Sequence, residues 1–373
     1  VILQSVIKRI QSQNSTDWLG LLVFSLSTPS SHSCQPEQLG MHSTALTRSF
    51  QRGIPQASRM QRHVQSSATP QKVATTDLQP VQLENINNFR DLADSCGHIQ
   101  KGRVLRCAKP SEASPADADA LLKAAGIRDL IDLRANDELA EDPQPSHLFS
   151  QATLRRYQRS WLGAQVRPAP GSNYLAPVVH HQVSLLERYR FYYSLLFHIP
   201  TTSLVSSMAL RLLNPEASRQ ILLKHVNQGG LGLLYRIIVD SAAPEVGCVL
   251  RLVQAGLEAR RPVLVFCKAG KDRTGIICAL LAVCSGATEA EILDDYTKSD
   301  AYHQVALAGI EKKPELRGLD MSVFERAPAH AMHTLLEHWK QVYGGPEEYM
   351  ERACGFSREH QARMRELLTR ESS

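Results

Sequence analysis

Residues 262–266, with the sequence Pro-Val-Leu-Val-Phe, form a short and wholly apolar run. A run of this length with β-branched side chains is typical of a strand that is buried on both faces of a sheet. The loop at 267–275 follows directly, and an apolar helical pattern at 274–284 comes next, with Gly286 as its stop signal. The sequence therefore predicts a central strand that leads through a tight loop into the start of a helix.

Another helix and strand precede this unit. Ser114 offers an N-cap, Pro115 occupies the first helical position, and Gly126 ends the helix. Residues 127–133 then form a strand, and Thr288 begins a later helix with a capping box. Strands that alternate with helices predict an α/β fold, with a central and mostly parallel sheet flanked by helices.

Residues 176–258 differ from this alternation, because their apolar side chains recur at spacings of three and four. We interpret the stretch as a helical insertion with breaks at Pro200, at Pro215 and at Gly229-Gly230. Its aromatic side chains are expected to belong to the core rather than to a binding surface: Tyr189, Phe191, Tyr192, Tyr193 and Phe197.

The loop at 267–275 combines residue types that suit phosphate chemistry. A tight loop at a helix start, here curled around Gly270, directs N–H groups inward and lies at the positive end of the helix dipole, so it can hold an anion. The same field favours the thiolate form of Cys267, which is the nucleophilic one. Arg273 carries a planar fork that can hold two phosphate oxygens, and Thr274 can donate to the thiolate or cap the helix.

The loop thus supplies a nucleophile, an oxyanion cradle and a clamp for phosphoryl transfer. No metal or other cofactor is required, because the loop itself offsets the phosphate charge. In the alternative reading, Cys267 is a buried thiol and Arg273 a surface charge, which leaves the two lysines and the glycines unexplained. A Walker-type nucleotide loop fits poorly, since Asp272 follows Lys271. The candidate catalytic residues are Cys267, Asp272, Arg273 and Thr274, and the candidate phosphate-binding residues are Lys268, Ala269, Gly270, Lys271, Asp272 and Arg273.

Charge and cysteine content exclude other classes of protein. The chain holds 42 Lys or Arg and 37 Asp or Glu, of which residues 1–78 account for seven and three. The remainder is nearly neutral, which argues against a nucleic-acid partner. The eight cysteines include no Cys-x-x-Cys pair and are expected to be reduced thiols. The longest apolar run, 18–26, falls short of the roughly 20 residues of a transmembrane helix, so none is predicted.

Residues 1–78 are predicted to be a disordered leader, and residues 79–373 a single domain. Between 41 and 76 the leader has five Lys or Arg, no acidic residue, and many Ser, Thr and Gln. This is the composition of an organellar transit peptide, so we expect residues 41–78 to direct the protein to a chloroplast or a mitochondrion. The alternative is an ordinary disordered tail of a cytoplasmic protein.

The motifs resemble those of the cysteine-dependent tyrosine and dual-specificity phosphatases. Within that family the sequence is most similar to an atypical branch, typified by a secreted mycobacterial enzyme that acts on phosphoproteins and phosphoinositides. The resemblance spans roughly 82–370, with no clear match between about 143 and 245. It is carried by Asn88-Phe-Arg-Asp-Leu92, Gly102-Arg-Val-Leu-Arg106, Gly126-Ile127, Asp132-Leu-Arg134, the loop at 267–275, Asp295-Tyr296 and Met364-Arg-Glu-Leu-Leu368.

The resemblance implies a phosphatase that forms a phosphocysteine at Cys267 and holds phosphate with the loop backbone and Arg273. The expected substrates are proteins phosphorylated on tyrosine, or on serine and threonine as well. Lys268 and Lys271, together with the basic stretch 155–167, suggest phosphoinositides or inositol phosphates as an alternative. A phosphate-binding scaffold without turnover is a further alternative.

The sequence departs from the family at two points. Phe266 occupies the position before the nucleophile, where the family usually has histidine. The general acid, which protonates the leaving oxygen and is worth roughly 10²–10⁴ in rate, is missing from its expected region, because residues 143–186 contain no Asp or Glu. The candidates for that role elsewhere are Asp272 in the loop, then Asp295, then Asp132.

Overall fold

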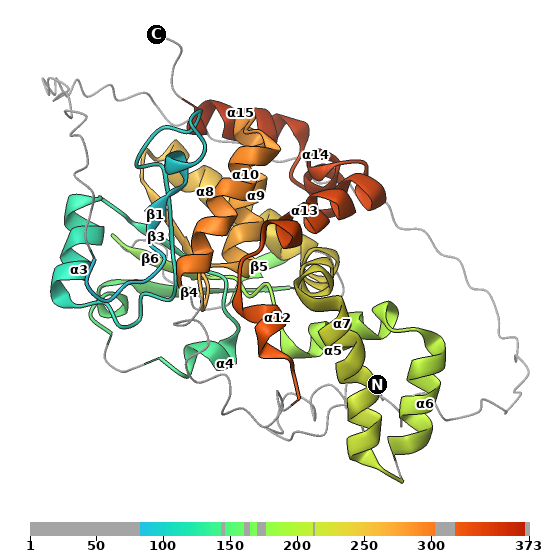
Figure 1. Cartoon of the computed structure of the whole chain (residues 1–373). Coiled ribbons are helices and arrows are strands. Elements are labelled where there is room, and N and C mark those ends of the chain that lie inside the picture. Colours follow the sequence, from blue (N-terminus) through green and yellow to red (C-terminus); the bar gives the residue numbers. More distant parts are fainter. Residues whose placement is uncertain are drawn as a thin grey trace, which may run out of the picture. The chain divides into compact units, whose positions relative to one another are not determined.

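The computed structural model describes residues 83–142, 146–159, 165–169, 177–211, 213–302 and 318–369. These residues form an α/β fold with one sheet and helices on both of its faces (Figure 1). The predicted leader, residues 1–78, lies outside the described residues, and so does the candidate transit peptide within it. None of the described helices is both long and apolar enough to cross a bilayer.

The sheet has the strand order β1-β2-β7-β3-β6-β4-β5. Its inner strands are parallel, and the two edge strands pair antiparallel with their neighbours. The predicted strand after Pro262 is β7, which lies in the sheet between β2 and β3 and is fully buried. The strands are β1 (Arg90–Asp91), β2 (Val104–Cys107), β3 (Asp129–Asp132), β4 (Thr153–Arg159), β5 (Val166–Pro168), β6 (Val179–Gln182) and β7 (Val263–Phe266).

Helices lie between β2 and β3, between β3 and β4 and between β6 and β7, and further helices follow β7. Some begin or end in short 3₁₀ or π-helical turns, which carry the label η. The helices are α3 (Pro115–Asp119), α4 (Asn136–Leu139), α5 (Arg188–His198), α6 (Thr201–Arg211), α7 (Pro215–Ser241), α8 (Ala243–Glu258), α9 (Asp272–Ser285), α10 (Glu289–Thr297), α12 (Met321–Glu325), α13 (Ala329–His338), α14 (Pro346–Glu348) and α15 (Arg358–Leu368). The turns are η1 (Leu92–Asp94), η2 (Ala120–Ala124), η3 (Phe149–Gln151), η4 (Lys298–Tyr302), η7 (Trp339–Tyr343) and η8 (Tyr349–Ala353).

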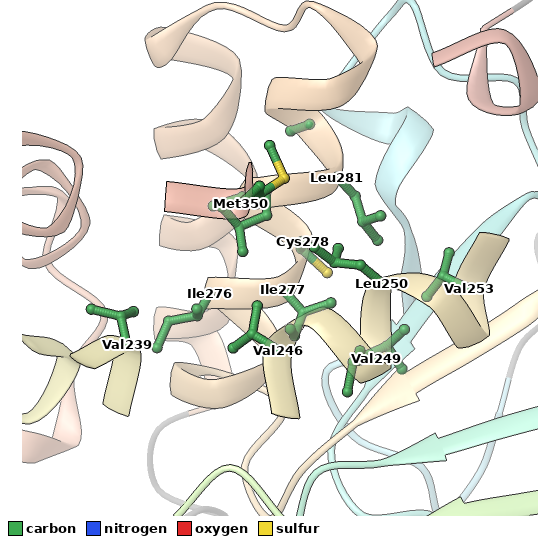
Figure 2. Packing of buried hydrophobic residues seen from close by; sticks show 14 of the residues in the cluster. Val239, Val246, Val249, Leu250, Val253, Ile276, Ile277, Cys278, Leu281 and Met350 are labelled. Carbon is green, nitrogen blue, oxygen red and sulfur yellow. The ribbon is translucent and has the colours of Figure 1, made fainter. Parts of the chain in front are cut away.

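Alternate residues of β7 face two separate apolar clusters. Val263 and Val265 belong to the larger cluster, which α8 and α9 share, whereas Leu264 and Phe266 belong to a smaller one with α3 and η2. This is the period-two alternation of a strand covered on both faces. Figure 2 shows part of the larger cluster, where side chains of α8 and α9 lie close together with Met350 of η8. The strand that carries Cys267 is therefore anchored from both sides.

Local sequence signals set the helix boundaries near the loop. Gly286 ends α9 in the left-handed conformation, with φ of 86°, as predicted. Ser114 and Asp117 form a reciprocal capping box at α3, and Thr288 and Glu291 form another at α10. These predictions are confirmed.

The predicted helical insertion at 176–258 is confirmed for most of its length, because α5, α6, α7 and α8 lie between residues 188 and 258. Residues 179–182 instead form β6, which lies between β3 and β4 in the sheet. The predicted break is confirmed at Gly230, where φ of 52° and ψ of −147° kink α7. The expectation of a buried aromatic set is wrong for three residues, because Tyr189, Tyr193 and Phe197 are 52%, 56% and 73% exposed. They lie on one side of α5 at spacings of four, where the described residues do not cover them.

Candidate active site

Cys267 follows the last residue of β7 and is 1% exposed. The loop after it curls back at Gly270, whose φ is +65°. A Cβ atom on this residue would lie 2.2 Å from the backbone oxygen of Cys107, at the end of β2. Because backbone cannot yield as a side chain does, only glycine fits here. The neighbouring strand thus fixes how closely the loop packs.

The carbonyl groups of the loop are held from outside. The Asn88 side-chain amide donates to the carbonyls of Ala269 and Gly270, both at 3.0 Å. Arg106 Nη2 donates to the Gly270 carbonyl at 2.7 Å, and the Lys109 N–H donates to the Lys268 carbonyl at 3.1 Å. With its carbonyls engaged on this side, the loop can offer its N–H groups to an anion on the other.

Asp295, on α10, pairs with two arginines on this side of the loop. Its carboxylate accepts from Arg90 Nε at 2.9 Å and also pairs with Arg106. Arg90 in turn contacts the side chain of Asn88. Asp295 is 3% exposed and carries the charge that two buried guanidiniums require. The interpretation of Asp295 as a proton donor is therefore wrong, because the structure makes it a buried support of the loop.

Arg273 lies in the first turn of α9 and is 8% exposed. Its guanidinium contacts both oxygens of Glu138, with 2.7 Å between Nη2 and Oε1. Burial opposes the ionisation of Glu138, but the charge and hydrogen bonds of Arg273 outweigh it and lower the pKa of Glu138 below its usual range. A carboxylate thus fixes the plane of the guanidinium before any substrate is bound.

Thr274 follows Arg273 and is fully buried, and its hydroxyl has no hydrogen-bond partner among the described residues. A buried hydroxyl without a partner is costly, so its presence calls for an explanation. Donation to the Cys267 thiolate, as the sequence suggests, would provide one.

Of the three candidate acids, Asp272 follows Lys271 of the loop directly, and 23% of its side chain is exposed. The Tyr235 hydroxyl, from α7, donates to Asp272 Oδ1 at 2.7 Å and lies 2.6 Å from the Tyr296 hydroxyl. Burial and the Asp272 charge raise the pKa of Tyr235, so it remains a donor. One oxygen of Asp272 is therefore held by a fixed partner. Tyr235 was not anticipated from the sequence.

The two lysines of the loop do not both face a substrate. Lys271 is 3% exposed, and its ammonium donates to three carbonyls at the end of α12, those of Phe324, Glu325 and Arg326, at 2.6 to 3.3 Å. As a side chain it caps α12 and does not bind phosphate, which corrects the prediction from the sequence. Lys268 is 19% exposed and pairs with Glu141 at 2.9 Å.

Asp132 is also excluded as the acid. It is fully buried beside Arg134, at 2.8 Å, and His180, at 2.9 Å. Burial raises its pKa, but Arg134 and His180 more than compensate and bring it to about 2. A carboxyl group with that pKa holds no proton near neutral pH. The guanidinium of Arg134 lies over Phe266, 5.7 Å from the ring centre, so a cation–π contact takes the place of the usual polar neighbour before the nucleophile.

Several residues of the site were missed as functional. Asn88 and Arg106 lie in motifs that carried the family resemblance, and Asp295 was expected only as a proton donor. The supporting roles of all three depend on contacts between residues more than 160 positions apart. Glu138 had no sequence signal of its own. In the described part of the chain, no group of three or more His, Cys, Asp or Glu is arranged to hold a metal ion.

Comparison with known proteins agrees with this geometry. A model of the tyrosine phosphatase family matches residues 81–370. A curated relative, the triple specificity protein phosphatase PtpB of Mycobacterium tuberculosis (strain ATCC 25618 / H37Rv), is 26% identical over 223 residues. The matched region covers 59% of this chain and 68% of the relative.

Proposed function

The chain belongs to the tyrosine phosphatase family, and we propose that it removes phosphate from phosphotyrosine, and from phosphoserine or phosphothreonine, in proteins. It is a phosphatase of the cysteine-dependent type, similar to a triple specificity protein phosphatase. The observation that supports the proposed mechanism best is the position of Cys267. It lies directly after β7, at the start of a loop whose carbonyls are held on the outside.

In the proposed reaction, the Cys267 thiolate attacks the phosphorus atom and the bond to the substrate oxygen breaks. The loop N–H groups and Arg273 hold the oxygens of the transferring phosphoryl group, where negative charge must be stabilised. Thr274 stabilises the thiolate when it departs again. Water then attacks the phosphocysteine, which releases inorganic phosphate and restores the thiolate.

The leaving oxygen needs a proton, and Asp272 is the proposed donor. It lies inside the loop, and Tyr235 holds one of its carboxylate oxygens. In the second step the same carboxylate would accept the proton of the attacking water, so Asp272 returns to its starting state.

Replacement of the nucleophile tests this function. Cys267→Ser should lower turnover of an aryl phosphate to below about one per cent, because the hydroxyl has no adjacent base to activate it. Vanadate should still bind, since the loop backbone is unchanged. Arg273→Lys should lose turnover as well, because an ammonium cannot hold two oxygens in one plane. Substantial turnover by Cys267→Ser would exclude the proposed nucleophile.

A phosphoinositide or inositol-phosphate substrate is the second candidate, and Lys268 is the observation that favours it. Lys268 is a residue of the loop, and its salt bridge to the half-exposed Glu141 can open to admit a second phosphate. Lys271 no longer supports this reading. Lys268→Gln should weaken activity on a phosphoinositide more than activity on a phosphotyrosine peptide. Binding of both without turnover of either would favour the scaffold reading instead.

Residues 41–78 are proposed to direct the protein to a chloroplast or a mitochondrion. Their five basic residues and abundance of Ser, Thr and Gln support this proposal. A fluorescent reporter fused after residue 78 should accumulate in one of these organelles. A diffuse cytosolic signal would contradict the proposal and would leave the catalytic one unaffected.

A further inference from the structure

A hollow of about 530 Å³ lies beside β5, the edge strand that is separated from β7 by β3, β6 and β4. One wall is β5, the second is α8, and the third is the end of η8 with the residues that follow it. These elements are found in Figure 1 by their labels and by the colour bar. None of the loop residues 267–273 lines the hollow, so it is a separate feature of the surface.

Three arginines line the hollow, one from each wall: Arg167, Arg251 and Arg352. All three are exposed. Arg167 donates to the side-chain oxygen of Gln165, and Arg251 donates to the Gly355 carbonyl at 3.1 Å. Within the described ranges, none of the three forms an ion pair with a carboxylate, in contrast to Arg134, which pairs with two. No carboxylate of the described residues therefore balances their positive charges.

The neighbouring acidic side chains are already used. Glu245, which follows Pro244 in the wall of the hollow, is buried and pairs with Arg159 and Arg190. Glu351, beside Arg352, pairs with Arg358 at 3.3 Å. Among the residues that the structure describes, no carboxylate lines the hollow itself.

The remaining ionisable group in the wall is Cys354, which does not supply a negative charge. It is 3% exposed, and burial raises the pKa of its thiol to about 12. The thiol is neutral at physiological pH. The lining therefore carries three positive charges and no negative one.

We propose that this hollow binds a small anion that carries several phosphate groups. A guanidinium offers a planar pair of donors that matches two phosphate oxygens, and three guanidiniums from three walls suit phosphates that point in different directions. The volume lies within the range of small-molecule sites. A linear polyphosphate and a phosphorylated ring share this chemistry, and the experiment separates them.

A bound anion would connect three elements of the fold. Arg251 lies on α8, which leads into β7, Arg167 on the edge strand, and Arg352 on the turn after α14. A ligand that binds only the folded protein raises the unfolding temperature. Binding should therefore be visible both in a titration and in thermal unfolding.

The experiment uses the full chain with Cys267→Ser, so that no probe is hydrolysed. Saturating vanadate is added so that the loop at 267–275, the phosphate loop, is occupied. Inorganic tripolyphosphate and inositol hexakisphosphate are titrated separately by calorimetry at about 0.15 M salt, near the physiological value. With the phosphate loop occupied by vanadate, at least one of the two probes should still bind, at a single site. Arg251→Gln combined with Arg352→Gln should weaken it at least about tenfold, because charge-assisted hydrogen bonds to two guanidiniums are lost.

A matched double variant controls for the loss of two positive charges. Lys123→Gln with Arg363→Gln removes two exposed cations whose carboxylate partners, Asp119 and Glu366, do not adjoin the hollow, and it should leave the affinity within about twofold. If the hollow variant unfolds, the two single variants are measured, each with a smaller loss. Absence of a vanadate-resistant site, or an equal loss in both double variants, would overturn the proposal.

Discussion

The phosphate loop and the arginine-lined hollow both present guanidinium groups, but they are built in opposite ways. At the loop, Arg273 is 8% exposed and already held by Glu138. At the hollow, Arg167, Arg251 and Arg352 are exposed and have no carboxylate partner in the described part of the chain. At the loop, Glu138 fixes the orientation of the Arg273 guanidinium. At the hollow, the positive charges of the three arginines are available to a ligand.

This difference matches what each site has to do. Chemistry on a phosphoryl group requires donors that are already in place, since reorganisation during the reaction would raise the barrier. Such donors are buried, and buried charges need partners such as Glu138 and Asp295. Reversible binding of an anion has no such requirement, because flexible side chains can close on the ligand. Rigid support should therefore matter at the loop and not at the hollow.

The largest effect is expected for Asp295→Asn, which removes the carboxylate shared by Arg90 and Arg106. Breaking a buried ion pair costs about 3–5 kcal/mol of the free energy of unfolding, to be measured by urea denaturation. Asp294→Asn is the matched control, because Asp294 is 54% exposed and pairs with Lys298 at the surface. Equal losses in the two variants would show that the outer support of the loop is not specific.

A smaller effect, of about 10²-fold in rate, is expected for Asp272→Asn with phosphoserine as substrate. An aryl phosphate should lose less, because its oxygen departs with little help from an acid. The ratio of kcat/KM for the two substrates measures proton donation rather than binding. Equal losses would mean that Asp272 only shapes the loop.

Glu138→Gln should lower kcat/KM by about tenfold, since the amide keeps one acceptor but loses the charge that holds Arg273. Glu141→Gln is the matched control, because that carboxylate pairs with Lys268. With a small aryl phosphate, Glu141→Gln should stay within about twofold of the original enzyme. A Glu138→Gln variant with full activity would show that Arg273 needs no fixed partner.

The smallest effect is expected at the hollow. Without added anion, Arg251→Gln should change the free energy of unfolding by no more than about 0.5 kcal/mol, as for other surface substitutions. Arg159→Gln should cost more, because it leaves the buried Glu245 with one partner fewer. A large loss for Arg251→Gln would contradict the comparison, since it would make this arginine part of the fold.

The sequence predicts β7, α9 and the helix starts well, because each depends on a local signal such as an apolar run, a capping residue or a glycine. It fails for β6, whose residues include His180 and His181. Because these side chains are polar, the strand does not stand out as an apolar run. The two imidazole rings can be buried because they donate hydrogen bonds to the carboxylates of Asp132 and Asp129 on β3. Such partners are distant in sequence.

The same limit applies at the site. Cys267, Gly270 and Arg273 are contiguous and could be identified from their spacing. The direction of the Lys271 side chain could not, because α12 lies more than 50 positions away. The exposed side of α5 was also missed, since a spacing of three and four shows that a helix is amphipathic but not whether another element covers it.

The pairing of each loop cation has a consequence for how substrate arrives. Lys271 lies 3.6 Å from Asp272, Lys268 pairs with Glu141 and Arg273 pairs with Glu138, so the three loop cations leave little net positive charge at the loop. Long-range attraction scales with net charge and is screened by salt. The rate at which a phosphorylated substrate encounters this enzyme should therefore depend only weakly on ionic strength, and selectivity among anions should arise after contact rather than during diffusion.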